Sequence, residues 1–298
     1  MNDSFSDRLK CLPLDLTLPS PMEVFVLNNR SLFVKRDDLI HPIISGNKWR
    51  KLMYHLHHYV ENPANGIISI GGAHSNHLHA LAYVSNLLGK PSTVYVYGWN
   101  QMFVTDTLRD IQNWNTQCLP ISRIDAQLFR NHQDEYKTLD GKTFYIIPEG
   151  GGGKRGLMGW KDWESEMPDG WDNKDNLLLV PCGTGTTLNG ILNHTHSIQL
   201  ASLKSVRQAT YSFEHSNRIH WLSNPLTSSF AKPGQQVVEL LRKTKSEFGL
   251  QLDPVYTGPL WYAFSEWHQL ENFRNIFFLH TGGCQGSRSN KYLNDSFR

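Results

Sequence analysis

The sequence predicts an α/β protein with mainly parallel sheets, and three observations support this prediction. Short apolar runs, expected as strands over residues 67–70, 93–97, 177–180 and 276–279, recur along the 298 residues. Segments with helical spacing lie between many of these runs, which is typical of parallel strands covered by helices. A glycine-rich or hydroxyl-rich segment follows several of the strands. Ligands are therefore expected outside the carboxyl ends of the strands.

The N-terminal part adds a hairpin and a helix. Two β-type runs, residues 24–27 and 31–35, flank Asn28 and Asn29, which predicts a tight turn between antiparallel strands. Ser45 can cap a helix with apolar residues at helical spacing, and Lys48 lies in its first turn. Other polar residues of this helix are expected in solvent: Arg50, Lys51, His55, His57 and His58.

Four more helices are expected further along the chain. They cover residues 75–88, where Gly89 ends the helix, the surroundings of residues 104–111, the segment after the loop at 183–187, and the surroundings of residues 237–248. Residues 196–229 are polar and irregular in pattern, so no element is predicted there.

Composition restricts the partners that this chain can have. The 29 basic and 27 acidic residues leave a net charge of +2, too small to attract nucleic acid or an anionic membrane. The four cysteines are far apart and form no C-x-x-C motif, so neither a structural zinc nor a disulfide framework is expected. The polar start and the lack of any run of roughly 18 apolar residues predict a cytoplasmic protein that does not enter a membrane.

The loop at residues 183–187 is a candidate phosphate site. Gly183 and Gly185 lie between a strand and a helix, where backbone N–H groups and the helix N-terminus attract an anion. The loop lacks the lysine of a Walker A motif and the third glycine of a dinucleotide fingerprint, so it suits a single phosphate. A tight turn with hydroxyl caps is the alternative.

Three side chains are candidates for catalysis, each with a structural alternative. Lys48 can be a partly desolvated amine that forms an imine, or a solvated charge. Ser75 can assist a reaction, or can act only as the N-cap of its helix. Tyr256 is either a catalytic acid or a packed aromatic residue.

Three nearby histidines, His74, His77 and His79, raise the possibility of a metal site. No carboxylate or thiol accompanies them at the spacing of metal ligands. We therefore expect no metal.

Several segments occur in the order typical of one enzyme family. They are Lys35-Arg36-Asp37-Asp38-Leu39, Ser45-Gly46-Asn47-Lys48, Gly71-Gly72 with Ser75-Asn76-His77, Pro148-Glu149-Gly150-Gly151, Gly183-Thr184-Gly185-Thr186, Asp253-Pro254-Val255-Tyr256-Thr257-Gly258 and His280-Thr281-Gly282-Gly283. Together they resemble the pyridoxal-phosphate enzymes of the tryptophan-synthase β fold, specifically the family of D-cysteine desulfhydrase and 1-aminocyclopropane-1-carboxylate deaminase. The resemblance covers most of the chain.

The resemblance implies fold type II, with two open, mainly parallel-sheet domains. We expect a larger cofactor-binding domain formed by residues 1–50 and 160–298, and a smaller α/β domain formed by residues 51–159. A homodimer that acts on a small amino acid is also expected.

The same resemblance assigns the residues that hold pyridoxal 5′-phosphate. Lys48 would carry the cofactor as an imine, and Asn76 would bind its phenolic oxygen. Thr281 would face the pyridine nitrogen. The phosphate would be held by Gly183, Thr184, Gly185 and Thr186.

Substrate contacts and catalysis are implied for other residues. Ser75 and the backbone around Asn76 and His77 would receive the substrate carboxylate, and Tyr256 matches a catalytic tyrosine. Lys48, once released by the substrate, would remove the α-proton. A neutral hydroxyl at Thr281 would leave the pyridine nitrogen unprotonated and the ring a mild electron sink.

These features favour D-cysteine desulfhydrase-like α,β-elimination, which gives an α-keto acid, ammonia and sulfide. Thr257 stands where the deaminase carries an acid, which weakens the case for opening of the cyclopropane ring. The activity of 1-aminocyclopropane-1-carboxylate deaminase is therefore the alternative rather than the first choice. Phe230 aligns with a second active-site tyrosine, and residues 150–154 lack the Ser-Asn pair that usually follows the glycines. A protein that binds pyridoxal phosphate without turnover is an alternative of another class.

Overall fold

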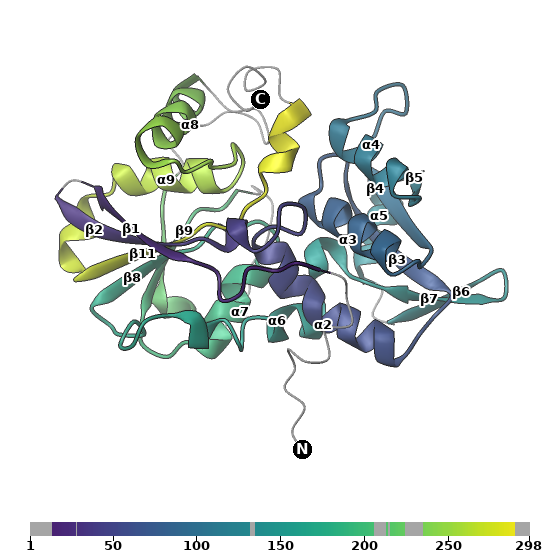
Figure 1. The fold of residues 1–298 in the computed structure, drawn as a ribbon, viewed down its shortest axis with the longest axis horizontal. Helices are drawn as coiled ribbons and strands as arrows, with labels where there is room; N and C mark the ends of the chain where they lie inside the picture. Colours follow the sequence, from purple (N-terminus) through teal and green to yellow (C-terminus); the bar gives the residue numbers. More distant parts are fainter. Residues whose placement is uncertain are drawn as a thin grey trace. The chain divides into compact units, whose positions relative to one another are not determined.

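The computed structural model describes residues 14–27, 29–131, 135–205, 213, 215–223 and 235–289. The chain forms two compact units, each with a sheet and helices that Figure 1 labels. Unit 1 comprises Met1–Leu16, His41–Ile44 and Lys48–Gly159, and unit 2 comprises Thr17–Ile40, Ser45–Asn47 and Trp160–Arg298. The predicted α/β class with mainly parallel sheets is confirmed.

Unit 2 contains a six-stranded sheet with the order β1-β2-β11-β8-β9-β10. Its strands are β1 (Met22–Leu27), β2 (Arg30–Lys35), β8 (Asn176–Leu179), β9 (Gln199–Ser202), β10 (Ile219–Trp221) and β11 (Asn275–Leu279). β1 and β2 form the predicted antiparallel hairpin, and the other pairings are parallel. Asn29 has a φ of 60°, as a tight turn requires, while Asn28 lies outside the described residues.

Both faces of this sheet are covered by apolar packing. Leu177 and Leu179 of β8 face the core that includes α8 (Gln235–Phe248) and α9 (Thr257–Ser265), whereas Leu178 faces the opposite core with α7 (Thr186–His194). Figure 1 shows α8 and α9 on one side of the strands and α7 on the other. A strand buried on both faces has a continuous apolar sequence, which explains the run that predicted β8.

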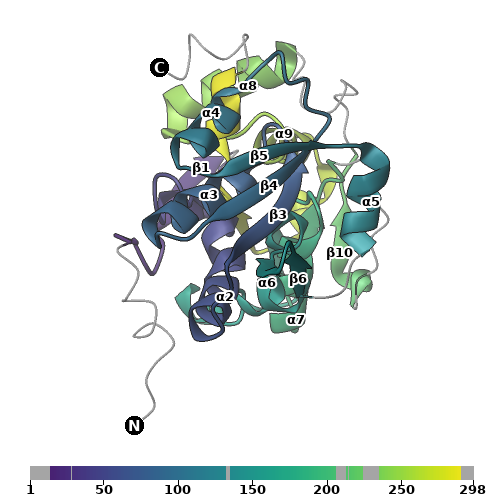
Figure 2. The same cartoon turned by 90° about the vertical axis from the view of Figure 1, so that its right-hand side faces the viewer.

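Unit 1 contains a five-stranded sheet with the order β5-β4-β3-β7-β6. Its strands are β3 (Gly66–Gly72), β4 (Ser92–Tyr97), β5 (Gln117–Ile121), β6 (Tyr136–Leu139) and β7 (Lys142–Ile146), of which only β6 is antiparallel to its neighbour. Figure 2 shows β3, β4 and β5 side by side. β3 and β4 were predicted from sequence, but β5, β6 and β7 were not. β5 lies at the edge of the sheet, where its Pro120 is tolerated.

The helices of unit 1 cover both faces of its sheet. Val94 and Val96 of β4 pack with α3 (Asn76–Leu87) and α4 (Asp106–Asn113), while Tyr95 points the other way and contacts Phe129 of α5 (Arg123–Asn131). The helices α2 (Asn47–Glu61) and α6 (Gly153–Met158) complete the set of described α-helices. Short 3₁₀ helices lie at Asp37–Leu39, Glu149–Gly151, Glu164–Glu166, Ser216–Arg218, His268–Asn272 and Cys284–Ser289.

The polar residues of α2 correct one sequence prediction. Arg50, Lys51 and His55 were expected in solvent, but their exposed fractions are 2, 6 and 3%. His55 is buried because both ring nitrogens have partners: Nδ1 lies 2.7 Å from the Tyr145 hydroxyl and Nε2 lies 2.9 Å from the Gly152 carbonyl. Because these partners are about 90 residues away along the chain, helical spacing alone could not identify them.

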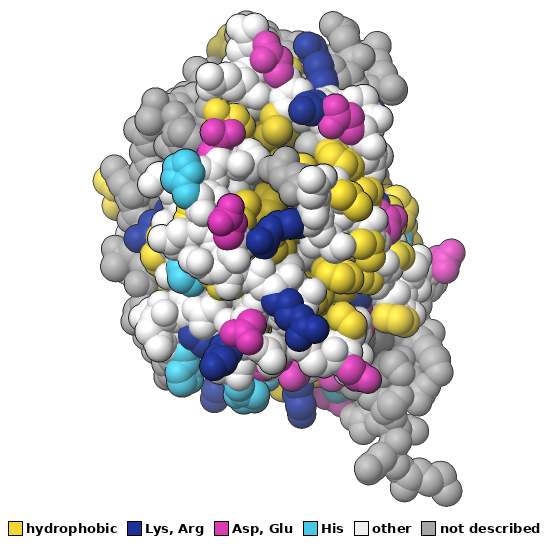
Figure 3. Space-filling view, turned by 90° about the vertical axis from the view of Figure 1, so that its left-hand side faces the viewer, with side chains coloured by type: hydrophobic (Ala, Val, Ile, Leu, Met, Phe, Trp, Pro, Cys, Tyr) yellow, Lys and Arg dark blue, Asp and Glu magenta, His cyan; other side chains and the backbone are white. Residues whose placement is uncertain are grey.

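The surface has no strong field of one sign on the face that Figure 3 shows, where acidic and basic side chains are interspersed and hydrophobic ones group along one side. This agrees with the net charge of +2. In the described part of the chain, no helix combines the length and apolar character that a membrane span needs.

Gly190 of α7 provides a test of this packing. A Cβ at residue 190 would lie 2.1 Å from Cδ1 of Trp160, whose side chain is fully buried. We expect Gly190→Ala to lower the free energy of unfolding by about 3 kcal/mol, because neither the helix nor the indole can move without disturbing the core. Urea denaturation measures the change.

Asn193→Ala, at an exposed position of the same helix, is the matched control. It is expected to change stability by less than about 0.5 kcal/mol. Equal stability of the two variants would contradict the packing that we describe.

Candidate active site

In unit 1, the carboxyl end of β3 leads directly into the N-terminus of α3. The Ser75 hydroxyl accepts a hydrogen bond from the Leu78 N–H at 3.3 Å, so Ser75 is the N-cap of α3. A Cβ at Gly71 would lie 2.8 Å from Ser75 Oγ, so only glycine allows the strand to end this close to the cap. A hydroxyl that accepts one bond can still donate its proton elsewhere, so a role as N-cap does not prevent a role in chemistry.

The next two residues differ in how their side chains are held. Asn76 is half-buried, and its Oδ1 is a buried atom without a hydrogen-bond partner in the described part of the chain. His77 is buried, and its Nε2 lies 2.9 Å from Ser69 Oγ, which itself donates to the Ile147 carbonyl. Burial lowers the pKa of His77 well below its ordinary value, so the imidazole is neutral.

The glycine-rich segment after β7 is anchored by groups that sequence analysis did not single out. The Tyr97 hydroxyl donates to Glu149 Oε1 at 2.6 Å, and Arg130 Nε donates to Glu149 Oε2 at 2.5 Å. Burial, followed by the bond to Glu149, raises the pKa of Tyr97 to about 12, so its hydroxyl stays protonated as a donor. A Cβ at Gly151 (φ 71°) would come within 3.0 Å of Lys51 Cβ, so this segment packs against α2.

Lys48 is the second residue of α2 and is half-buried. Its place in the first turn confirms the predicted position along the helix. The charges of Lys51 and Lys48 contribute to lowering the pKa of His77, which places these lysines in the same part of unit 1 as His77.

In unit 2, the loop after β8 forms the N-terminus of α7. Gly185 is its N-cap with a φ of 89°, and within the described residues no side-chain cap bond forms at this N-cap. The hydroxyls of Thr184 and Thr186 lie 3.2 Å apart beside this uncapped turn. Backbone N–H groups at an uncapped helix N-terminus favour an anion, so this geometry suits a phosphate group.

Tyr256 lies against this loop. A Cβ at Gly183 would be 2.9 Å from the Tyr256 ring, so a larger residue at position 183 would displace the tyrosine. The backbone of Tyr256 is fixed by Asp253, whose Oδ1 accepts its N–H at 2.7 Å and the N–H of Val255 at 2.8 Å.

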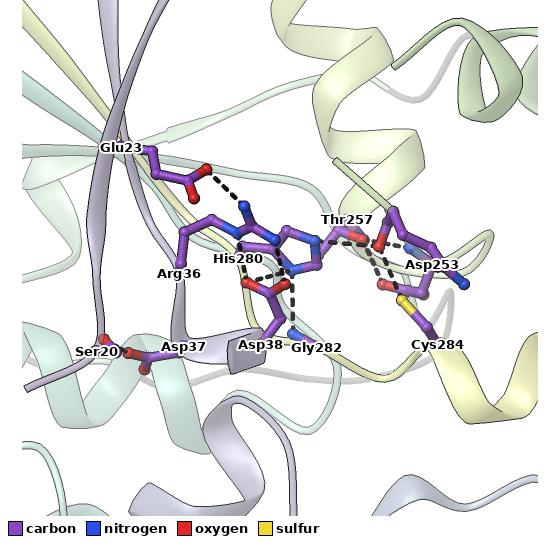
Figure 4. Close-up of polar contacts among 11 residues, drawn as sticks. Ser20, Glu23, Arg36, Asp37, Asp38, Asp253, Thr257, His280, Gly282 and Cys284 are labelled. Carbon is purple, nitrogen blue, oxygen red and sulfur yellow. Dashed lines mark hydrogen bonds and ion pairs between the residues drawn. The ribbon is translucent and has the colours of Figure 1, made fainter. Parts of the chain in front are cut away.

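Figure 4 shows that Thr257 also points toward Asp253. The Thr257 hydroxyl donates to Asp253 Oδ2 at 2.6 Å, and the Thr257 side chain is fully buried. Thr257 thus supports the turn behind Tyr256. Asp253 was part of a motif in the sequence analysis but received no role there.

Thr281 follows β11 and is buried in contact with the segment that precedes Lys48. The Thr281 carbonyl accepts a bond from the Asn47 N–H at 3.4 Å. A Cβ at Gly46 (φ 64°) would lie 1.9 Å from that carbonyl oxygen. Asn47 in turn donates through Nδ2 to Thr187 Oγ1 at 3.0 Å, which links this contact to the first turn of α7.

The candidate residues therefore form one group in each unit. Unit 1 gathers Ser75, Asn76 and His77 at the start of α3, and unit 2 gathers the residues 183–186, Tyr256 and the Thr281 segment. Phe230 lies outside the described residues.

The three histidines considered for a metal site do not share a ligand geometry. His79 Nε2 lies 2.9 Å from Asp110 Oδ2, and His77 contacts Ser69 instead. His74 is exposed. Within the described ranges, no three His, Cys, Asp or Glu side chains converge as metal ligands do.

Comparison with known proteins gives one consistent result. The family described as pyridoxal-phosphate dependent enzyme matches residues 19–219. The bifunctional D-cysteine desulfhydrase/1-aminocyclopropane-1-carboxylate deaminase of Arabidopsis thaliana is 27% identical, with 90% of this chain and 77% of the relative covered. The D-cysteine desulfhydrase of Salmonella newport is 26% identical, with coverage of 86 and 87%. The crystal structure of a deaminase homologue has a TM-score of 0.73 at 22% identity over 99% of both chains.

The buried His55 predicts a pH dependence of stability. Burial lowers its pKa to about 4 from an ordinary value of 6.5, so the stability it contributes is complete above pH 6.5 and is lost as the pH falls toward 4. We expect the wild type to lose about 3 kcal/mol more unfolding free energy over this interval than a His55→Asn variant. Urea denaturation at several pH values measures the difference.

His268→Asn is the control, because His268 is exposed. Its pH profile should follow that of the wild type. A His55→Asn profile parallel to that of the wild type would show that His55 does not titrate in this way.

Proposed function

The chain belongs to the pyridoxal-phosphate dependent enzyme family, and we propose that it catalyses α,β-elimination on a small amino acid in the manner of D-cysteine desulfhydrase. The products would be an α-keto acid, ammonia and sulfide. The observation that carries this proposal is the uncapped N-terminus of α7, which begins at a left-handed Gly185 between two threonine hydroxyls.

The residues present fit pyridoxal 5′-phosphate. Gly183, Thr184, Gly185 and Thr186 would hold the phosphate through backbone N–H groups and hydroxyls. Asn76, whose buried Oδ1 has no partner within the described residues, would donate through its Nδ2 to the phenolic oxygen. Thr281 would meet the ring nitrogen. When bound, the cofactor supplies an aldehyde for a lysine amine and a ring that accepts electrons from the α-carbon.

The chain's own groups would then perform the proton transfers. Lys48 would bind the cofactor and, once its amine is released, take the proton from the α-carbon of the substrate. Ser75, with the backbone N–H groups of Asn76 and His77, would hold the substrate carboxylate at the N-terminus of α3. Tyr256 would act as an acid near the leaving group. Its backbone N–H is held by Asp253.

Loss of a β-substituent fits this set of groups better than ring opening. Residue 257 is a threonine whose hydroxyl donates a hydrogen bond to Asp253. It therefore offers no acid to help open an unactivated ring. Ring opening of 1-aminocyclopropane-1-carboxylate is the second candidate, because the relative from Arabidopsis thaliana bears both names. A protein that binds the cofactor without turnover is the non-enzymatic alternative.

Three further features are part of this proposal. Residues 1–50 and 160–298 would form the larger cofactor-binding domain, and residues 51–159 the smaller one. The enzyme would act as a homodimer. It would function in the cytoplasm.

Replacing Lys48 tests the cofactor assignment. Lys48→Ala is expected to remove the visible absorption band of the lysine-bound cofactor and all turnover, while the far-UV circular dichroism stays unchanged. Borohydride reduction of the wild type followed by peptide mapping should place the pyridoxyl group on Lys48. Labelling of Lys51 or another lysine would refute the assignment, and Lys90→Ala at an exposed position is the control.

A panel of amino acids tests the substrate. Keto-acid release should be faster from D-cysteine or β-chloro-D-alanine than from 1-aminocyclopropane-1-carboxylate, because elimination needs only a brief carbanion and a good leaving group. L-Cysteine and D-serine complete the panel. Preference for the cyclopropane acid would select the deaminase alternative, and no release despite bound cofactor would select binding without turnover.

A further inference from the structure

His280 lies between β11 and the loop that carries Thr281, and its side chain is fully buried. Its backbone N–H donates to the Lys35 carbonyl at 3.0 Å, and its own carbonyl accepts from the Asp38 N–H at 3.0 Å. Both backbone groups of His280 are thus fixed beside the end of β2. The imidazole therefore extends from a backbone that two hydrogen bonds hold in place.

The two ring nitrogens of His280 contact groups of opposite kind. Nε2 lies 3.1 Å from the carbonyl of Gln251, which can only accept, so Nε2 carries the proton. Nδ1 accepts a bond from the N–H of Gly282 at 3.2 Å. These partners define one neutral tautomer, Nε2–H, with Nδ1 as an acceptor for the loop.

Burial is the largest effect on the pKa of His280 and lowers it, while the charges around the imidazole act in both directions. Asp38 Oδ1 lies 3.7 Å from Nδ1, but both Asp38 oxygens accept bonds from Arg36, at 2.9 and 2.8 Å (Figure 4). Burial lowers the pKa of His280, Asp38 and Asp253 raise it, and Arg36 lowers it. Cys284 shares the Gln251 carbonyl, and burial raises the pKa of its thiol, so it adds no charge.

The N–H of Gly282 that binds His280 lies in a tightly packed loop. A Cβ at Gly282 (φ 66°) would lie 2.1 Å from Ser45 Oγ, and a Cβ at Gly46 would lie 1.9 Å from the Thr281 carbonyl oxygen. The peptide groups of Thr281 and Gly282 therefore lie directly on the segment Ser45–Asn47. A rotation of the Gly282 N–H would move the Thr281 peptide against this segment.

We infer that His280 is a positioning residue: through the N–H of Gly282 it sets the orientation of Thr281 and of the segment that immediately precedes Lys48. The effect on catalysis rests on the proposed function, in which the Thr281 hydroxyl meets the ring nitrogen of the cofactor. The effect on the loop itself does not depend on that function.

Two replacements separate the two bonds of the imidazole. In His280→Asn, the amide oxygen can take the place of Nδ1 and accept from Gly282. In His280→Gln, the amide nitrogen can take the place of Nε2 and donate to Gln251, but no acceptor remains for Gly282. Cys284→Ala is the control, because it removes a different bond to the same Gln251 carbonyl.

Hydrogen exchange of the Gly282 amide gives a readout without cofactor. We expect protection in the wild type, His280→Asn and Cys284→Ala, and exchange at least about tenfold faster in His280→Gln, the factor that corresponds to one lost hydrogen bond. Equal protection in all four proteins would overturn the inference. Faster exchange in Cys284→Ala as well would also overturn it, because general loosening around Gln251 would then be the cause.

The cofactor gives the second readout. His280→Gln should bind pyridoxal phosphate about tenfold more weakly and shift the pH profile of the bound cofactor's absorption, whereas His280→Asn should keep both close to the wild type. If exchange at Gly282 changes as expected but affinity and pH profile do not, the link to Thr281 and the cofactor is wrong. A wild type that binds no cofactor would refute the proposed function and leave the exchange result to decide the role in the loop.

Discussion

The contact between the backbones of Ser45–Asn47 and Thr281–Gly282 is the constraint on which the candidate site of unit 2 depends. It allows no side chain at either glycine, since a Cβ at Gly46 or at Gly282 would overlap atoms about 2 Å away. The contact joins the end of β11 to the residues that lead into α2. Asn47 then reaches Thr187, so the same few residues also fix the start of the helix that would bind phosphate.

Polar groups buried behind the site hold this contact in place. Arg36 pairs with both Asp38 and Glu23, and Asp253 satisfies the N–H groups at the turn that leads into α9. A buried carboxylate without such partners would be costly. These buried polar side chains form a layer next to the groups proposed for chemistry, and Figure 4 shows most of that layer.

Sequence patterns predicted the elements whose signal is local. The hairpin, the cap at Ser75 and the buried strand β8 depend on residues close together in the chain, and all three are confirmed. β10 has only three residues and β5 contains Pro120, so neither gives a clear alternating pattern. His55, Arg130 and Asp253 owe their roles to partners that periodicity does not reveal. The motifs indicated which residues are candidates for the chemistry, but only the fold shows how the side chains of Thr257 and His280 are oriented.

The approach of Trp160 to Gly190 has a consequence for how this protein can change over generations. The indole occupies the place of a side chain at residue 190, so each position limits what the other can become. A smaller residue at 160 would leave a void in the core, and a larger one at 190 would collide with the indole. An exchange at one of these positions alone would therefore lower stability, and a matching exchange at the other position is the change that could compensate for it.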